Sequence, residues 1–336
     1  MKKEQINIFF ACDDNYIPFL SVTLASMFKN CEKGRFYNIC ILNSGLKEEN
    51  IKKISAEFYS SNIEINFCDV SEELEKISNR LHTRDYYSKS TYFRLFIPSL
   101  FPNIDKALYL DCDILLKDDI SRLYDTKLGN NLIGAIHDSF VDTNKALGQY
   151  VKHRIGVKAK KYFNAGVILM NLKEMRKFDF KDKFINLLSS VKFDVAQDQD
   201  YLNALCKGRV KFIEEKWNFM PLESQNVNKK ISLIHFNLDY KPWQKDGIMF
   251  AQLFWEYAHK SIFAEEISNI KDNFDAKKQL KAKVQTFNLI SLCLAQANDK
   301  DENKKIKEII KAIKKEKIEY EQSYSIERET FIACEN

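Results

Sequence analysis

Lys106-Ala-Leu-Tyr-Leu-Asp-Cys-Asp-Ile-Leu-Leu116 is an apolar run interrupted by two carboxylates one residue apart. The run is short, apolar and without helical periodicity, which predicts a buried strand. Two charges at the end of such a strand are costly unless a cation neutralises them. Asp111 and Asp113 are therefore suited to hold a hard divalent cation, with coordination sites left for water or phosphate oxygens. Because surface loops often contain Asp-x-Asp by chance, the motif needs support from the rest of the chain.

Strands and helices alternate on both sides of this run. Apolar stretches at 6–12, 38–42 and 63–67 predict strands, and helical spacing of apolar residues appears at 17–30 and 48–59. Further strands are expected at 132–137, 167–171 and 232–236. The alternation predicts an α/β fold in which helices flank a Rossmann-like, mostly parallel sheet.

Polar side chains stand at or just after the ends of several of these strands. Asp13 follows the first strand, Asp111 and Asp113 interrupt the central one, and His235 lies near the end of the 232–236 run. In open α/β sheets, ligands bind at the carboxyl ends of the strands. We therefore expect one cleft to collect these four residues.

The composition narrows the range of functions. The 336 residues are 45% hydrophobic, and 52 basic against 47 acidic residues leave a net charge of only +5. So small an excess does not indicate a nucleic-acid partner. No stretch is long enough to span a bilayer, and residues 1–5 lead into the first strand without a signal-peptide pattern. We expect a cytoplasmic protein, free or peripheral on the inner face of the cytoplasmic membrane.

The eight cysteines show no Cys-x-x-Cys pair and no regular spacing. Cys12, Cys40, Cys68 and Cys112 sit within or beside apolar runs. This pattern favours buried, reduced thiols over a disulfide framework or a zinc site.

The chain changes character from about residue 264, where strand-like runs end. We expect an α/β unit at 1–263 and a helical, Lys-rich appendage at 264–336. Ile306, Ile309, Ile310 and Ile313 form an apolar stripe within a lysine-rich helix. Such a helix can lie on an anionic membrane surface or pack against its own domain or a partner, and the sequence leaves both open.

Seven motifs occur in an order that resembles glycosyltransferase family 8. They are Phe10-Ala-Cys-Asp-Asp-Asn-Tyr16, Ser90-Thr-Tyr-Phe-Arg-Leu95, Leu108-Tyr-Leu-Asp-Cys-Asp113, Tyr162-Phe-Asn-Ala-Gly-Val-Ile-Leu-Met-Asn-Leu172, Asp198-Gln-Asp200, Trp217-Asn-Phe-Met220 and His235-Phe-Asn-Leu-Asp-Tyr-Lys-Pro-Trp243. The likeness covers about residues 6–258 and is nearest to the bacterial lipooligosaccharide α-1,4-galactosyltransferase subgroup.

The resemblance implies a GT-A fold and a retaining, metal-dependent hexosyltransferase. The expected donor is UDP-galactose or UDP-glucose, and the motifs leave the choice between these sugars open. The expected acceptor is a lipopolysaccharide, a lipooligosaccharide or another cell-envelope glycan, and the product an α-linkage made at the cytoplasmic face of the membrane. Peripheral membrane contact would come through the C-terminal helices.

The resemblance also assigns roles at the nucleotide end. Asp111, Asp113 and His235 would hold Mn²⁺ or Mg²⁺, and a mixed carboxylate–imidazole set suits manganese better than calcium. Lys241 would contact the diphosphate.

Uracil and ribose contacts would come from the loop after the first strand, at Ala11, Asp13, Asn15 and Tyr16. Without the resemblance, residues 13–15 would be interpreted as a cap for the helix at 17–30.

Donor-sugar contacts are implied for Arg94, Asn164, Asp198 and Gln199, with Asp138 nearby. The candidate catalytic residues are Gln199, Asp198 and Asp138. An amide is a poor nucleophile, so Gln199 is interpreted as a positioning and electrostatic group. Asp198 would orient the sugar, and a double-displacement role for it stays open.

One position departs from the family pattern, and parts of the sequence allow three other functions. Leu238 replaces a glycine that lets the backbone approach the diphosphate, so a weak or inactive glycan-binding scaffold is the main alternative. An oxidoreductase is disfavoured because no Gly-x-Gly-x-x-Gly follows the first strand. A phosphatase with an Asp-x-Asp nucleophile normally carries that motif near the chain start, which disfavours it here.

Overall fold

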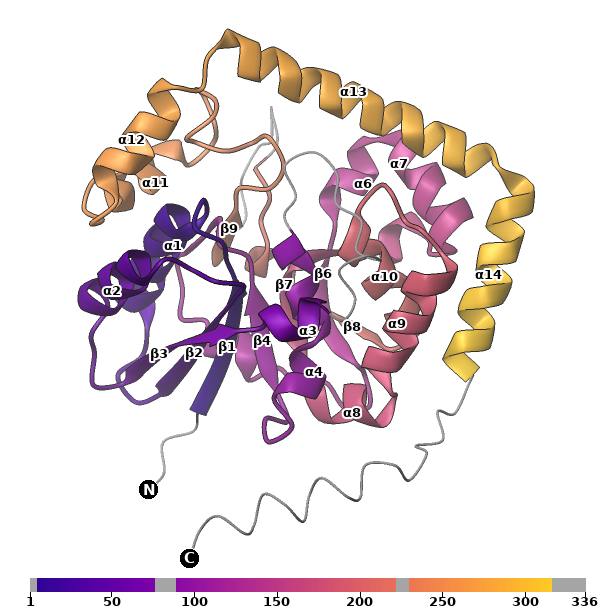
Figure 1. Cartoon of the computed structure of the whole chain (residues 1–336), viewed down its shortest axis with the longest axis horizontal. Helices are drawn as coiled ribbons and strands as arrows, with labels where there is room; N and C mark the ends of the chain where they lie inside the picture. Colours follow the sequence, from indigo (N-terminus) through magenta and orange to yellow (C-terminus); the bar gives the residue numbers. More distant parts are fainter. Residues whose placement is uncertain (1–4, 76–88, 222–229, 316–336) are drawn as a thin grey trace, which may run out of the picture.

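The computed structural model describes residues 5–75, 89–221 and 230–315 and has a seven-stranded sheet at its centre (Figure 1). The strand order is β3-β2-β1-β4-β7-β6-β8. Its strands are β1 Gln5–Ala11, β2 Phe36–Asn43, β3 Ile63–Asp69, β4 Ala107–Leu110, β6 Ile133–His137, β7 Phe163–Met170 and β8 Val210–Phe212. The strands β5 Ile114–Leu116 and β9 Leu233–His235 form a separate two-stranded sheet.

Most neighbouring strands of the large sheet run parallel, as the sequence predicted. β3, β2, β1 and β4 are mutually parallel, and so are β6 and β8. Only β7 runs against its two neighbours, β4 and β6. The sheet is therefore mixed but mostly parallel, in a GT-A-type arrangement.

Helices cover both faces of this sheet. The longer ones are α1 Ile17–Asn30, α2 Glu48–Glu57, α9 Phe180–Ser190, α10 Gln197–Cys206, α11 Ala251–Ala258, α12 Ala264–Asp272, α13 Ala276–Asn298 and α14 Lys300–Lys315. The shorter ones are α3 Ser71–Glu75, α4 Ile97–Leu100, α5 Ser121–Tyr124, α6 Ser139–Thr143, α7 Lys145–Tyr150 and α8 Leu172–Lys177. Short 3₁₀ helices are η2 Lys89–Leu95, η4 Ala159–Lys161 and η5 Glu215–Trp217, and η3 Val151–Ile155 is π-helical.

Two apolar clusters fill the two faces of the sheet. Along β1, Ile8 belongs to one cluster and Phe9 to the other, and along β4 Leu108 and Tyr109 divide in the same way. Successive side chains of a strand point to opposite faces, so this division follows from the period of two. Strands buried on both faces explain why the sequence shows continuous apolar runs instead of alternation.

The run that was predicted as one strand is two strands in two sheets. β4 ends at Leu110, Asp111 donates its backbone N–H to the Gly166 oxygen, and the chain then leaves the large sheet. β5 begins at Ile114, which lies opposite His235 of β9 in antiparallel pairing. The prediction of a single strand across the carboxylates was therefore wrong, and so was the expectation that 232–236 joins the main sheet. The change of partner places Asp111 and Asp113 on the turn between two strands.

The prediction of reduced thiols was wrong for one pair. Cys40 of β2 and Cys68 of β3 are joined in a disulfide, with 6.4 Å between their Cα atoms. Their strands are parallel neighbours, and Cys68 lies opposite Leu42, two residues beyond Cys40. Cysteine spacing alone does not reveal such a pairing. Cys12, Cys31, Cys112, Cys206 and Cys293 are free thiols, and Cys334 lies outside the described residues.

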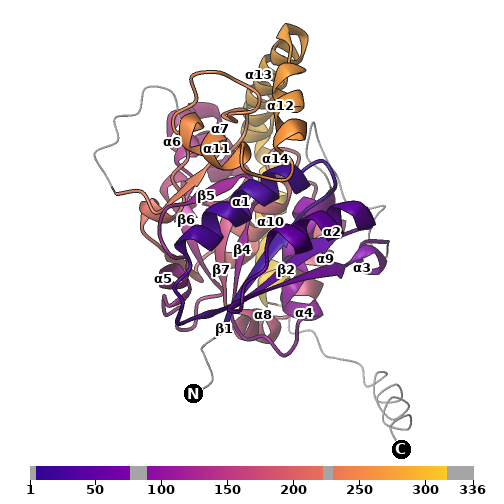
Figure 2. The same ribbon diagram turned by 90° about the vertical axis from the view of Figure 1, so that its left-hand side faces the viewer.

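The C-terminal segment is helical to Lys315, as expected, and residues 316–336 lie outside the described part of the chain. α11 and α12 contact α1, α13 contacts α7 and η3, and α14 contacts η3 and α9. In Figure 1, α13 and α14 run along the edge of the molecule, and Figure 2 shows α13 projecting at the top.

The isoleucine stripe of α14 does not face outward. Ile306, Ile310 and Ile313 are buried, and Ile309 packs against the same core cluster. Of the two interpretations left open by the sequence, packing on its own domain is confirmed for α14, and a membrane contact through this stripe is wrong. The division at residue 263 stays a prediction. Among the described helices, none combines the length and apolar character that crossing a bilayer would need.

Candidate active site

A cleft opens where β1 and β4 end and brings together most of the predicted site residues. Its lining includes Ala11, Asp13, Tyr16, Arg94, Asp111, Asp113, Asp138, Asn164, Asp198, Gln199, Leu238 and Lys241. His235 is buried beside it, and Asn15 is exposed and not part of the lining. The structure therefore brings the four expected residues together: Asp13, Asp111 and Asp113 line the cleft, and His235 is buried beside it.

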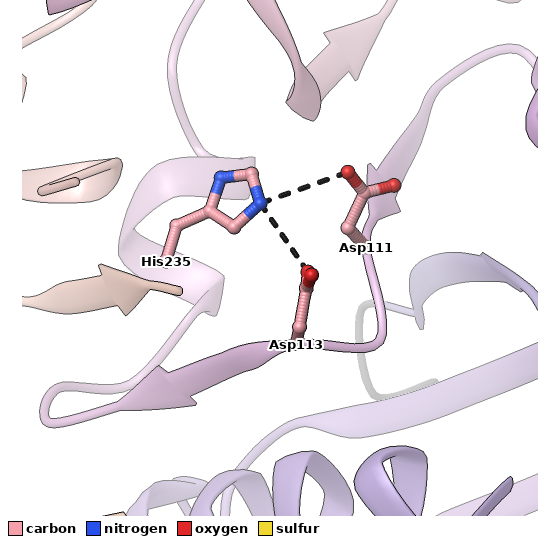
Figure 3. Close-up of side chains that lie close together, drawn as sticks. All are labelled: Asp111, Asp113 and His235. Carbon is pink, nitrogen blue, oxygen red and sulfur yellow. Dashed lines mark ion pairs between the residues drawn. The ribbon is translucent and has the colours of Figure 1, made fainter. Parts of the chain in front are cut away.

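Two carboxylates and one imidazole form a compact cluster in this cleft. Figure 3 shows Nε2 of His235 pointing between Asp111 and Asp113. Nε2 lies 3.3 Å from Asp113 Oδ1 and 3.7 Å from Asp111 Oδ2, and the three ligand atoms lie within 4.8 Å of one another. The pairing of β5 with β9 creates this proximity, because Ile114 lies opposite His235.

A residue to which the sequence assigned no role fixes the imidazole. Asn218 donates through Nδ2 to Asn164 Oδ1 at 2.9 Å, which leaves its own Oδ1 to accept from His235 Nδ1 at 2.9 Å. With the proton on Nδ1, the lone pair of Nε2 points at the two carboxylates. Asn218 belongs to the Trp217-Asn-Phe-Met220 motif, so the sequence marked its position, but only the structure shows its role.

The donor set fits a divalent cation. Asp113 Oδ1 is buried and has no hydrogen-bond partner, although it faces the imidazole. A buried carboxylate oxygen without a partner is costly unless a cation completes it. Gly166 leaves the space beside the cluster open, since a Cβ at that position would stand 2.5 Å from Asp111 Oδ2 and even nearer His235 Cε1. Asp111, Asp113 and His235 thus fit a metal site of the Asp-x-Asp type.

Lys241 is buried against the same carboxylates. Its Nζ contacts Asp113 Oδ2 and donates to the Phe236 oxygen at 2.9 Å. Burial raises the pKa of Asp113, but the charge and the hydrogen bond of Lys241 outweigh it and hold this pKa well below its usual range. Asp113 is therefore an anion at neutral pH.

Arg94 joins the metal cluster to Asp198. Its Nη2 donates to Asp111 Oδ1 at 3.0 Å, and its guanidinium carbon lies 4.2 Å from the ring centre of Tyr109. Nε lies 3.1 Å from Asp198 Oδ2 but donates to the Thr91 oxygen at 2.9 Å. Asp198 Oδ2 is accordingly paired by charge and lacks a hydrogen bond.

The carboxyl group of Asp198 is held near its neutral form. Burial raises the pKa of Asp198 to about 7, with the charge of Arg94 opposing the rise and Asp111 adding to it. A carboxyl group that titrates near neutral pH in a cleft is typical of functional sites.

We expect Asp198→Asn to reduce the loss of stability with rising pH in the metal-free protein. The unfolded carboxyl titrates near 3.8 and the folded one at about 7. The folded state therefore holds a proton that the unfolded state has released, and the free energy of unfolding falls across this window. Between about pH 5 and about pH 8, the asparagine variant should lose on the order of 2–3 kcal/mol less than wild type. Urea unfolding at both pH values measures it, and equal losses would contradict the assignment.

Gln199 is held in one orientation by hydrogen bonds to three neighbours. Its Oε1 accepts from the Ala165 N–H at 2.8 Å and from Asn164 Nδ2 at 3.4 Å, and its Nε2 donates to Asp138 Oδ2 at 3.0 Å. Asp138 in turn caps α6 by accepting from the Phe140 N–H at 3.0 Å. Burial raises the pKa of Asp138, and these hydrogen bonds oppose the rise. The amide oxygen of Gln199 is occupied, as a positioning role requires.

The opposite end of the cleft is formed by the loop after β1. Asp13 Oδ1 accepts from the backbone N–H groups of Asn15 and Tyr16, at 3.1 and 3.2 Å, just before α1. Asp13 thus fixes the turn that precedes this helix, whose N-cap Tyr16 has no side-chain cap, and it also lines the cleft beside Ala11 and Tyr16. Asn15, in contrast, points to solvent in this structure.

Leu238 adopts the backbone conformation that favours glycine. Its φ is 56°, and it lines the cleft next to Asn237, whose Oδ1 accepts from the Leu238 N–H at 2.8 Å. The loop therefore contains a left-handed turn at a leucine, and a leucine in this conformation is strained.

Leu238→Gly should stabilise the protein slightly and strengthen UDP binding. Relief of the left-handed strain is worth ~1–2 kcal/mol, and the added backbone freedom of glycine offsets ~0.5–1 kcal/mol of it. The net gain in unfolding free energy is then about 0.5–1 kcal/mol, which denaturant unfolding measures. Removal of the side chain also opens the cleft, so UDP should bind more tightly, as calorimetry measures. Leu238→Ala, which shortens the side chain but keeps the strain, is the control. Weaker UDP binding in the glycine variant would contradict the prediction.

Residues 7–247 match the family described as Glycosyl transferase family 8. A Haemophilus influenzae protein classed as a glycosyltransferase is 32% identical over 251 residues, which cover 72% of this chain and 74% of that protein. A lipopolysaccharide 1,2-glucosyltransferase of Escherichia coli K12 is 28% identical over 263 residues, covering 73% of this chain and 75% of that enzyme. The galactosyltransferase LgtC, solved with donor and acceptor sugar analogs, has a TM-score of 0.64 and 31% identity, covering 76% of this chain and 96% of LgtC.

These similarities agree with the geometry of the cleft. The matched residues include the Asp-x-Asp turn and His235, whereas α13 and α14 lie beyond them. The GT-A-type sheet and the sequence match exclude the oxidoreductase and phosphatase alternatives, and the protein is a glycosyltransferase of the hexosyltransferase class that acts on a sugar donor and a glycan acceptor. The chain belongs to glycosyltransferase family 8.

Proposed function

We propose that this enzyme transfers galactose or glucose from a UDP-sugar to a lipopolysaccharide, lipooligosaccharide or other cell-envelope glycan, with retention and in α-linkage. The observation that carries the proposal is the group of candidate metal ligands, Asp111, Asp113 and His235, which lies beside Lys241 at the carboxyl ends of β1 and β4. Support also comes from the similarity to a lipopolysaccharide 1,2-glucosyltransferase and to the galactosyltransferase LgtC.

In this proposal Asp111, Asp113 and His235 hold Mn²⁺, or Mg²⁺ in its place. Two carboxylate oxygens and one imidazole nitrogen suit manganese, which accepts both ligand types. When bound, the ion neutralises the diphosphate and acts as a Lewis acid for the leaving group. Asn218 keeps His235 in the tautomer that can ligate.

The nucleotide lies toward the loop after β1. Ala11, Asp13, Asn15 and Tyr16 contact uracil and ribose, which for the exposed Asn15 requires a change of side-chain position. Lys241 is placed to exchange its contact with Asp113 for one with the diphosphate. A cation fixed at the leaving group stabilises the charge that develops as the glycosidic bond breaks.

The donor sugar lies between Arg94, Asn164, Asp198 and Gln199. Arg94 presents donors in a fixed plane, and Gln199, held by Ala165, sets the position of the reacting carbon.

We assign Gln199 a positioning role, together with Asp138, which accepts from its amide. Asp198 orients the sugar.

We further propose that the enzyme works at the cytoplasmic face of the membrane, where a glycolipid acceptor would be presented. Lipid-linked acceptors partition into the bilayer, so an enzyme that acts on them gains from a position at its surface.

The test is UDP release from UDP-galactose and from UDP-glucose by the full chain, with and without manganese. We expect metal-dependent release from one donor, and the identity of that donor names the sugar. UDP calorimetry on the same sample separates the outcomes. Absence of both turnover and UDP binding would overturn the proposal and favour the catalytically weak scaffold, with Leu238 as the obstacle.

A further inference from the structure

Helix α13 has an exposed apolar face. Leu280, Val284, Phe287 and Leu294 are four of the six large apolar side chains exposed in the described part of the chain, with Leu280 62% and Phe287 69% accessible. Their spacings of four, three and seven residues place them in one stripe, because an α-helix has 3.6 residues per turn. This is a different surface from the isoleucine stripe of α14, which is buried.

The charges of α13 are all of one sign. The 23-residue helix contains four lysines and neither Asp nor Glu. Lys277, Lys281 and Lys283 are exposed, and at about 100° per residue they fall on the two sides of the stripe. An apolar stripe flanked by lysines is typical of helices that lie in the interface of an anionic bilayer.

The opposite side of α13 faces the enzyme. Cys293 and Ala297 are buried there, and the helix contacts α7 and η3. Leu289, two residues from Phe287 and so about half a turn away, lines the active-site cleft. One helix therefore borders the cleft on one face and is exposed and apolar on the other, as its course along the molecular edge in Figures 1 and 2 allows.

We propose that the outward face of α13 docks on an anionic lipid bilayer and so brings the cleft next to the membrane. Charge complementarity favours lipid over a second copy, since a two-fold contact through this face would bring identical lysines together. Delivery of a lipid-linked acceptor rests on the proposed function, but the docking itself does not.

Sedimentation of the full chain with vesicles tests the apolar stripe. Vesicles of phosphatidylcholine alone are compared with vesicles that also contain phosphatidylglycerol. Wild type should bind the anionic vesicles, and the triple variant Leu280→Ser, Val284→Ser, Phe287→Ser should lose binding. Tyr59→Ser, which removes an aromatic side chain exposed elsewhere, is the matched control and should bind as wild type.

The charge arm uses Lys277→Gln, Lys281→Gln, Lys283→Gln in one chain. Each lysine near an anionic surface contributes about fivefold to partitioning, so the three together should weaken it by roughly 100-fold.

A control that neutralises Lys33, Lys47 and Lys52 removes the same charge from another surface and should have a much smaller effect.

A positive signal comes from Phe287→Trp with brominated lipids. Its fluorescence should be quenched on anionic vesicles relative to wild type, which already has three tryptophans, whereas that of Tyr59→Trp should not. The proposal is overturned if wild type ignores anionic vesicles, if the apolar variant still binds them, or if that variant instead breaks a dimer seen by sedimentation velocity. UDP calorimetry without lipid should be unchanged in every variant, so a failure of docking is distinguishable from a failure of the proposed transferase activity.

Discussion

Asp113→Ala is expected to lower kcat/KM for UDP-sugar turnover by ~10²- to 10³-fold. The substitution removes one of three ligands of the metal site and the buried oxygen that lacks a partner. Loss of electrostatic stabilisation of this kind costs ~3–4 kcal/mol in the transition state. It also leaves Lys241 buried without its carboxylate, so we expect lower stability as well. UDP release assays and manganese calorimetry measure the first effect, and denaturant unfolding measures the second.

Two comparisons keep this result interpretable. Asp113→Ala combined with Lys241→Met also removes the buried ammonium that has lost its carboxylate, so it should recover stability without recovering turnover. Asp118→Ala changes an aspartate five residues away that bonds Ser232 and does not line the cleft, and it should retain turnover. Near-normal, metal-dependent activity in Asp113→Ala would contradict the assignment of this ligand.

Gly166→Ala is expected to weaken manganese binding by ~10- to 100-fold and to lower the free energy of unfolding by ~1–3 kcal/mol. The new Cβ would stand 2.5 Å from Asp111 Oδ2 and closer to His235 Cε1, so both ligands must move. Gly166 lies in β7, buried on both sides, and cannot move away easily. Manganese calorimetry and urea unfolding measure the two effects.

Gly148→Ala is the matched control and should change stability in the opposite direction. Gly148 lies in helix α7, and a Cβ there meets only the Val141 oxygen, at 3.6 Å. Alanine in a helix is favoured over glycine by up to ~1 kcal/mol. If Gly166→Ala were as well tolerated as Gly148→Ala, the close packing of the metal site would be disproved.

Most of the sheet could be predicted because its strands are buried on both faces and bounded by polar loops. The first helix begins at Ile17 and ends at Asn30, as the apolar spacing indicated. The three-residue strand β8 was missed, since Val210–Phe212 is too short to show a period. Strand partners could not be predicted either, which is why the Cys40–Cys68 disulfide was not expected.

The candidate site divides in the same way. Asp111, Asp113 and His235 were predicted as a set from their motifs, and the structure brings them together. Asn218 was not assigned a role, because its function depends on a hydrogen bond to a residue 17 positions away. A side chain that positions another leaves no local pattern in the chain.

The sequence alone determined the α/β class, most of the succession of strands and helices, and the residue types that meet at the carboxyl ends of the strands. These properties depend on local periodicity and on short motifs, which can be recognised without knowing the tertiary contacts. Only the tertiary structure decided that the chain passes from one sheet to the other at the Asp-x-Asp turn. It also decided that burial raises the pKa of Asp198 and which helix face stays exposed. Ile310 of α14 and Phe287 of α13 are both apolar, yet one is buried and the other exposed. Periodicity shows that a helix has an apolar face, but what covers that face depends on distant parts of the chain.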